Sequence, residues 1–143
     1  MIRTRLMVAA TALLLAGGGA QAQQAAPAAV PQPDFAKVEI KTTDLGDNVY
    51  MMEGRDPGSV GGNITVAVAK NGIIMVDGQF APLHDKVKAA VANVSGLPIK
   101  YLVNTHYHGD HTGGNRGLEK QVVAIVAHAN VRKRLVEDQR AKP

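Results

Sequence analysis

The stretch NTHYHGDHTGGN, residues 104–115, decides how the rest of the sequence is interpreted. It holds three of the five histidines of the chain, with an aspartate among them. It directly follows an apolar run, residues 99–103, that is typical of a buried strand. The end of such a strand is a common position for functional residues in α/β folds. Imidazole nitrogens and carboxylate oxygens suit zinc, manganese or iron, so the stretch predicts a metal site.

The spacing within this stretch explains how its side chains converge. In extended backbone, side chains two residues apart point to the same side, so we expect His106 and His108 to lie on one side. The residue between them, Tyr107, should point away. Gly109 permits a sharp turn that brings Asp110 and His111 back beside the first pair. Four candidate ligands in the pattern H-x-H-x-D-H make a polar turn with chance histidines a poor explanation.

Apolar runs and turn residues predict the surrounding elements. An Asn-Gly pair at residues 71–72 between two apolar runs is a strong hairpin signal. The glycine-rich residues 55–62 favour a loop. The order is a series of strands followed by alternating strands and helices, which predicts a mixed α/β (α+β) fold with helices packed on one sheet. Strands are expected at residues 38–40, 49–52, 64–69, 73–76, 99–103 and 122–127, and helices at residues 83–94 and 131–139.

Residues 104–115 resemble the signature loop of the metallo-β-lactamase-fold hydrolases, and the glycine loop, hairpin and helix before it follow the order of that family. The resemblance implies an αββα sandwich with a dinuclear metal site, usually zinc, with iron or manganese as alternatives. It implies that His106 and His108 bind the first metal, and that Asp110 and His111 bind the second. Asp77 matches the acidic residue at a strand end of the family, which supports ligands more often than it binds metal.

The same resemblance implies a reaction. A metal-activated water attacks a small-molecule substrate that is a β-lactam, a lactone, a thioester or a phosphoester, and Asp110 is the catalytic residue that orients the water. Relatives on this fold also use iron for oxidation or electron transfer, which gives a second hypothesis. Metal content separates the two, because zinc supports hydrolysis and stoichiometric iron supports redox chemistry.

The number of ligands gives a third hypothesis. Two catalytic zinc ions need about six protein ligands, and the loop supplies four. In the family, the remaining ligands lie in the second half of the domain, so we expect them beyond Pro143 and interpret residues 35–143 as the N-terminal half of the domain. A fragment with half a site would be inactive. His128 follows the run 122–127 and is a weak candidate ligand, since a histidine at a helix start more often bonds to the backbone.

The first 34 residues divide into a leader and a linker. Residues 1–22 have two arginines, an 11-residue apolar core and a small-residue tail ending in Ala-Gln-Ala, which is the layout of a secretory signal peptide. The core is shorter than the roughly 20 residues of a membrane-spanning helix. Residues 23–34 are rich in Ala, Gln and Pro and indicate a linker. We therefore expect a periplasmic or secreted protein with no stable membrane insertion after cleavage.

Composition excludes several classes of function. The chain has no cysteine, which rules out disulfides, thiolate zinc sites and thiol catalysis within it. Its formal charge of +4 comes without a basic stripe, so we expect no nucleic-acid partner. Composition leaves the oligomeric state open.

Export should remove residues 1–22 and leave Gln23 as the new N-terminus, because a peptidase cleaves after the Ala-Gln-Ala sequence. Intact-mass analysis of periplasmic material measures this directly. Protein that keeps its leader and stays in the membrane fraction would show that the segment is an anchor.

Overall fold

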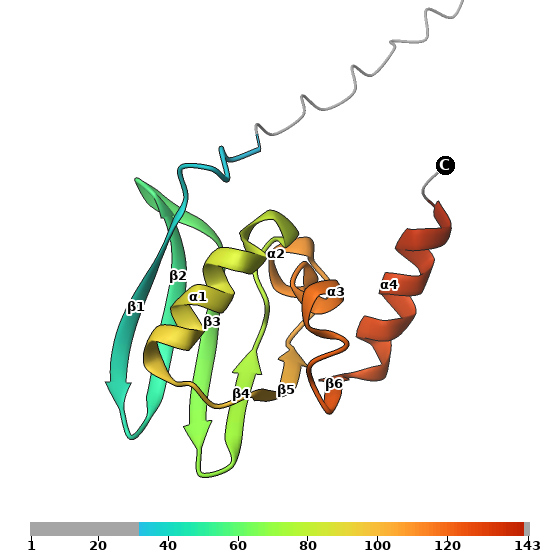
Figure 1. Cartoon of the computed structure of the whole chain (residues 1–143). Coiled ribbons are helices and arrows are strands. Elements are labelled where there is room, and N and C mark those ends of the chain that lie inside the picture. The colour runs from blue at the N-terminus through green and yellow to red at the C-terminus, as the bar shows by residue number, and fades with distance from the viewer. Residues whose placement is uncertain (1–31, 142–143) are drawn as a thin grey trace, which may run out of the picture. The chain divides into compact units, whose positions relative to one another are not determined.

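The computed structural model describes residues 32–141, so the predicted leader and most of the linker lie outside the described residues. Six strands form a single sheet whose order is the same as their order in the chain (Figure 1). The strands are β1 (Glu39–Gly46), β2 (Val49–Asp56), β3 (Gly58–Ala69), β4 (Gly72–Val76), β5 (Ile99–Asn104) and β6 (Ala124–Ala127). The first four strands pair antiparallel, whereas β4, β5 and β6 pair parallel to one another.

Helices fill the connections of the parallel part, as parallel strands require a crossover. A short 3-10 turn, η1 (Ala81–Leu83), leads into α1 (His84–Val94), which connects β4 to β5. Two single-turn helices, α2 (Gly109–Thr112) and α3 (Asn115–Leu118), lie between β5 and β6, and α4 (Ala129–Ala141) follows β6. None of the helices within residues 32–141 combines the length and hydropathy that crossing a bilayer requires.

Most of the predicted elements are present, including the mixed sheet and the hairpin at residues 71–72, where Ala69 pairs with Gly72. The predicted loop at residues 55–62 is wrong. In the structure β2 and β3 stay paired there, with Arg55 opposite Ser59. Gly54 permits this, because a Cβ at that position would lie 2.6 Å from the carbonyl oxygen of Val60. Gly54 therefore allows close strand pairing, whereas Gly61 and Gly62 lie where the register between β2 and β3 shifts.

The strand predicted at residues 122–127 begins two residues later. The backbone N–H of Val122 donates to the carbonyl of Leu118, which closes a turn after α3. The N–H of Val123 donates to the carbonyl of Lys100 before regular pairing starts at Ala124. These two residues connect α3 to the sheet and are not part of β6.

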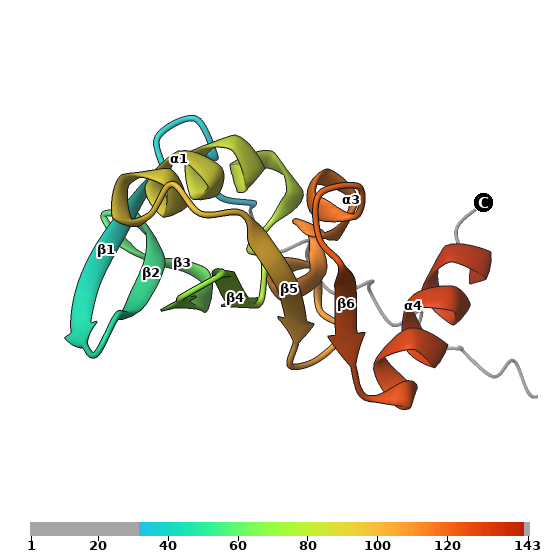
Figure 2. The ribbon, with the colours of Figure 1, turned by 60° about the horizontal axis from the view of Figure 1, so that its bottom comes forward.

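The core lies between the sheet and α1. Figure 2 shows α1 and α3 on the same side of the sheet. One apolar cluster joins Val87 and Val91 of α1 to Ile73, Met75 and Leu102 of the central strands. The alternate residues of those strands point to the other face, where Ile74 is 41% exposed and Tyr101 is 40% exposed. Within the described residues, the sheet thus has one covered face and one apolar face without a covering layer.

Truncation of Leu102 to alanine should lower the free energy of unfolding by about 2–5 kcal/mol, because it leaves a cavity in the packed core. Leu45→Ala is the matched control, since Leu45 is 59% exposed near the end of β1 and its truncation should cost at most about 0.5 kcal/mol. Urea unfolding of the two variants gives the comparison. Equal losses would contradict the assignment of the core to this face.

Candidate metal centre

The candidate centre lies at the carboxyl ends of β4 and β5. Because these neighbouring strands are parallel, the residues that follow them meet at the same edge of the sheet. Val76 pairs with Val103 at the end of the ladder, and the N–H of Asp77 donates to the carbonyl of Val103 at 2.7 Å. Asp77 is thereby placed beside Thr105, the first residue after β5.

The carboxylate of Asp77 connects the two strand ends and the histidine loop. Asp77 is only 3% exposed. Its Oδ1 accepts a hydrogen bond from the N–H of Thr105 at 2.8 Å, and its Oδ2 accepts one from Oγ1 of the same residue at 2.7 Å. The Nδ1 of His111 lies 2.8 Å from Oδ2. A buried carboxylate needs such donors to offset its desolvation, and here they also fix the orientation of one imidazole.

The four candidate ligands of the loop lie together as two pairs of donor atoms. The Nε2 of His106 is 3.2 Å from the Nδ1 of His108. The Nε2 of His111 is 3.3 Å from Oδ2 of Asp110. The rings of His106 and His111 have centroids 3.9 Å apart and are tilted by 51° to one another, so the two pairs are neighbours. The structure therefore brings together all four side chains that the sequence singled out.

The spacing within each pair fits two ligands of one zinc ion. Zinc–ligand bonds of about 2.0–2.2 Å at tetrahedral angles separate two donor atoms by about 3.3–3.6 Å. A neutral His111 that donates from Nδ1 to Asp77 presents a lone pair on Nε2 to the carboxylate of Asp110. Two acceptors face each other in that arrangement, and a cation between them relieves the repulsion. Among the described residues, no group of three or more histidine, aspartate or glutamate side chains is arranged to hold one metal ion.

His106 and His108 do not converge through extended backbone, so that prediction of the local geometry is wrong. Extended backbone was expected to bring them to one side, but β5 ends at Asn104 and the residues after it form a bend. The bend leads into α2, whose first turn carries Asp110 and His111. The two histidine rings still meet edge to face, with centroids 4.8 Å apart. The residue pattern therefore predicts that the two histidine rings lie together, but it does not predict the bend that brings them together.

Other residues of the loop have supporting contacts. Tyr107 lies beside the ring of His108, and the guanidinium of Arg134 on α4 lies 5.0 Å from the Tyr107 centroid. This cation–π contact ties α4 to the loop. Asn104 is buried, donates to the carbonyl of His111 at 3.4 Å and accepts from Asn115 at 2.8 Å.

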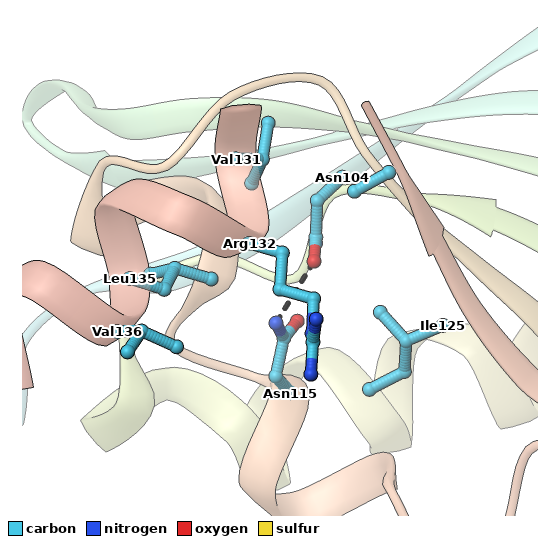
Figure 3. Close-up of a pocket in the computed structure, with 8 residues that line it drawn as sticks. Asn104, Asn115, Ile125, Val131, Arg132, Leu135 and Val136 are labelled. Carbon is cyan, nitrogen blue, oxygen red and sulfur yellow. Dashed lines mark hydrogen bonds between the residues drawn. The ribbon is translucent and has the colours of Figure 1, made fainter. Parts of the chain in front are cut away.

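The pair formed by Asn104 and Asn115 borders a cavity of about 290 Å³ between β6 and α4 (Figure 3). The α4 side of this cavity is mainly apolar, with Val131, Leu135 and Val136. The cavity separates the start of α4 from the sheet, so this helix packs less closely than α1 does.

His128 makes a hydrogen bond to the backbone, as its position before a helix predicts. Its Nδ1 accepts a hydrogen bond from the N–H of Asn130 at 3.2 Å, at the start of α4. This is the backbone role expected of a histidine at a helix start, and its role as a ligand stays a prediction.

Sequence reasoning missed Gln79, and it marked Gly62 only as part of a glycine-rich segment whose backbone approaches another group closely. Gln79 is completely buried, and a Cβ at Gly62 would overlap the imidazole of His111. Gln79 has a positive φ of 62°, which costs a residue with a side chain about 1–3 kcal/mol. No local pattern marks these contacts, because they join segments about 17 residues or more apart.

Comparison with known proteins gives a consistent result. The profile of the Metallo-beta-lactamase superfamily matches residues 57–143, more than half of the chain. A hydroxyacylglutathione hydrolase of Synechococcus sp. is 44% identical over 69 residues, which are 44% of this chain and 27% of that protein. An alkyl/aryl-sulfatase of Saccharomyces cerevisiae is 28% identical over 79 residues, 54% of this chain and 12% of that protein.

A solved structure gives the same fold. It is the crystal structure of a metallo-beta-lactamase from Pseudomonas aeruginosa in a mono-zinc form, with a TM-score of 0.62 and 22% identity. The match covers 72% of this chain and 48% of that chain. The chain thus spans about half the length of this solved structure and about a quarter of the hydroxyacylglutathione hydrolase.

Replacement of Asp77 by alanine should lower the free energy of unfolding by about 1–3 kcal/mol, because it leaves the Thr105 donors without their acceptor. Asp138→Ala, at an exposed position of α4, should stay within about 0.5 kcal/mol of the parent chain. Denaturant unfolding measures both. If the Asp77 variant were as stable as the Asp138 variant, the carboxylate would not hold the strand ends together.

Proposed function

The chain belongs to the metallo-beta-lactamase superfamily, and we propose that it is the metal-binding part of an exported, zinc-dependent hydrolase. The observation that carries this proposal is the pairing of donor atoms in the loop after β5, at 3.2 Å and 3.3 Å. Two such pairs side by side suit two metal ions. Nitrogen and carboxylate donors without thiolate are the set that hydrolytic zinc sites commonly use.

In this proposal, His106 and His108 hold one ion, and Asp110 and His111 hold the other. When bound, zinc would act as a Lewis acid and would lower the pKa of a bound water to about 7. Asp110 orients the attacking water from its position in the first turn of α2, and Asp77 holds His111 through Nδ1. The match covers 48% of the solved metallo-beta-lactamase, and we propose that the remaining ligands lie in the part of that fold outside the match.

The substrate is proposed as a small molecule with a bond that water can break. The matched proteins carry the names of a hydroxyacylglutathione hydrolase, an alkyl/aryl-sulfatase and a metallo-beta-lactamase, which act on different substrates. We therefore keep β-lactam, lactone, thioester and phosphoester as the candidate classes. We propose no nucleic-acid partner, and we propose the periplasm or the exterior as the location on the basis of residues 1–22.

The proposal is tested by substituting each candidate ligand in a polypeptide that contains the whole metallo-beta-lactamase domain. His106→Ala and His108→Ala should each remove about one zinc equivalent, because each takes away half of one donor pair. Asp110→Asn should keep the fold and lower turnover roughly 10²–10⁴-fold, since it removes the charge that orients the water. Elemental analysis gives the metal content, and hydrolysis of a panel with one substrate of each class gives the activity.

Two variants serve as controls. His128→Ala removes a histidine whose ring bonds to the start of α4, and Tyr107→Phe keeps the ring beside His108. Both should retain the metal content of the parent. Stoichiometric iron with redox activity would replace the hydrolase proposal with the oxidation or electron-transfer alternative. Full turnover and full metal content in Asp110→Asn would contradict a dinuclear site.

A further inference from the structure

Gln79 is a buried amide with no free hydrogen-bonding group. It is 0% exposed and lies in the turn between β4 and η1. Its Nε2 donates to the carbonyl of Val60 at 2.8 Å and to the carbonyl of Gly62 at 2.6 Å. Its Oε1 accepts from the N–H of Phe80 at 3.0 Å. Both amide protons and the oxygen are used, so the orientation of the side chain is fixed.

These bonds hold the first half of β3 against the site. The two acceptor carbonyls flank Gly61, whose φ is 69°, and a Cβ at Gly61 would overlap Oε1 of Gln79. The backbone of β3 is therefore hydrogen-bonded to the turn after β4 on both sides of Gly61. Only glycine fits there, because its φ is positive and a Cβ would overlap Gln79. Residues 61–63 lie at a register shift between β2 and β3 and have no paired residue on β2, so the amide of Gln79 is their connection to the turn after β4.

The fastened backbone covers the imidazole of His111. A Cβ built on Gly62 would overlap the ring, so the bare Cα of Gly62 lies directly against it. The ring of His106 lies near the same ring, with centroids 3.9 Å apart. With Nδ1 bonded to Asp77, the ring of His111 has little freedom to rotate, and its Nε2 stays directed toward Asp110.

We propose that Gln79 is a positioning residue for the candidate metal centre, acting through the carbonyls of Val60 and Gly62 on the ring of His111. We call Gln79, Val60 and Gly62 the Gln79 clamp. The clamp contacts His111 of the Asp110–His111 pair directly, and it reaches the His106–His108 pair only through the contact between the rings of His111 and His106. This inference rests on the proposed role of His111 as a ligand. It predicts that the loss of one buried amide weakens one metal position selectively.

Stepwise zinc affinity of the complete polypeptide tests the clamp. Gln79→Met keeps a long side chain without hydrogen-bonding groups, and Gln79→Gly suits the positive φ while it removes the amide. Both should weaken the second zinc equivalent about 10–100-fold and leave the first unchanged, as measured by competition with a chromophoric chelator. Gln121→Met is the matched control, because the Gln121 amide also donates to a backbone carbonyl, that of Gly117, but at an exposed position.

A second pair of variants tests the same contact from the other side. Gly62→Ala should reproduce the loss at the second equivalent, because the added methyl displaces the ring of His111. Gly58→Ala, also on β3, should behave like the parent, since a Cβ there meets nothing within 4 Å. The ring signals of His111 in the NMR spectrum of metal-free protein give a readout that needs no zinc. They should shift or broaden in Gln79→Met and in Gly62→Ala, but not in the controls.

The outcomes separate the clamp from the proposed function. Unchanged His111 signals and zinc affinities in both Gln79 variants would overturn the clamp. An equal loss of both zinc equivalents, together with a loss of cooperative unfolding, would show a merely structural role and would also overturn it. A parent protein that binds no zinc, with His111 signals that still respond to Gln79→Met, would overturn the proposed function and leave the clamp intact.

Discussion

The carboxylate of Asp77 is the interaction on which the arrangement of the site depends. It lies where two parallel strands end, and it accepts hydrogen bonds from the backbone and the hydroxyl of Thr105 while it faces Nδ1 of His111. Backbone bonds reinforce this junction, because the N–H of Gly78 donates to the carbonyl of His111 at 2.7 Å. The strand ends and the loop thus form one connected unit. The donors offset the cost of burying the carboxylate, so the same contacts that position the loop also stabilise Asp77.

How far the sequence predicts this structure depends on the range of the interactions. The grouping of the four loop side chains was predictable, because they lie within six residues of one another and turn chemistry brings them together. The β4 strand, α1 and β5 were predictable from apolar spacing. Residues 55–62 were not, since a glycine-rich segment does not show whether it will pair with a neighbour. Gln79 was beyond local reasoning altogether, because its role depends on carbonyls brought close by the hairpin between β3 and β4.

The sheet is apolar on both faces in its parallel part. In β4, Ile73 and Met75 pack against α1, while Ile74 and Val76 face away from it. Strands with apolar residues in succession are typical of sheets that are covered on both sides. In the αββα sandwich that the family resemblance implies, a second sheet lies on the outer face. The length of the solved relative, about twice the matched part of this chain, accords with such a layer.

The strand order also has a consequence for assembly of the sheet. Each strand pairs with the strand that precedes it in the chain, so the sheet is able to grow in the direction of synthesis, one edge at a time. No strand has to be inserted between two that are already joined. The first four strands are joined by short hairpin connections, and α1 is the crossover between the parallel strands β4 and β5. In this order of assembly, the histidine loop joins the sheet together with β5. The turn after β4 then already lies beside β3.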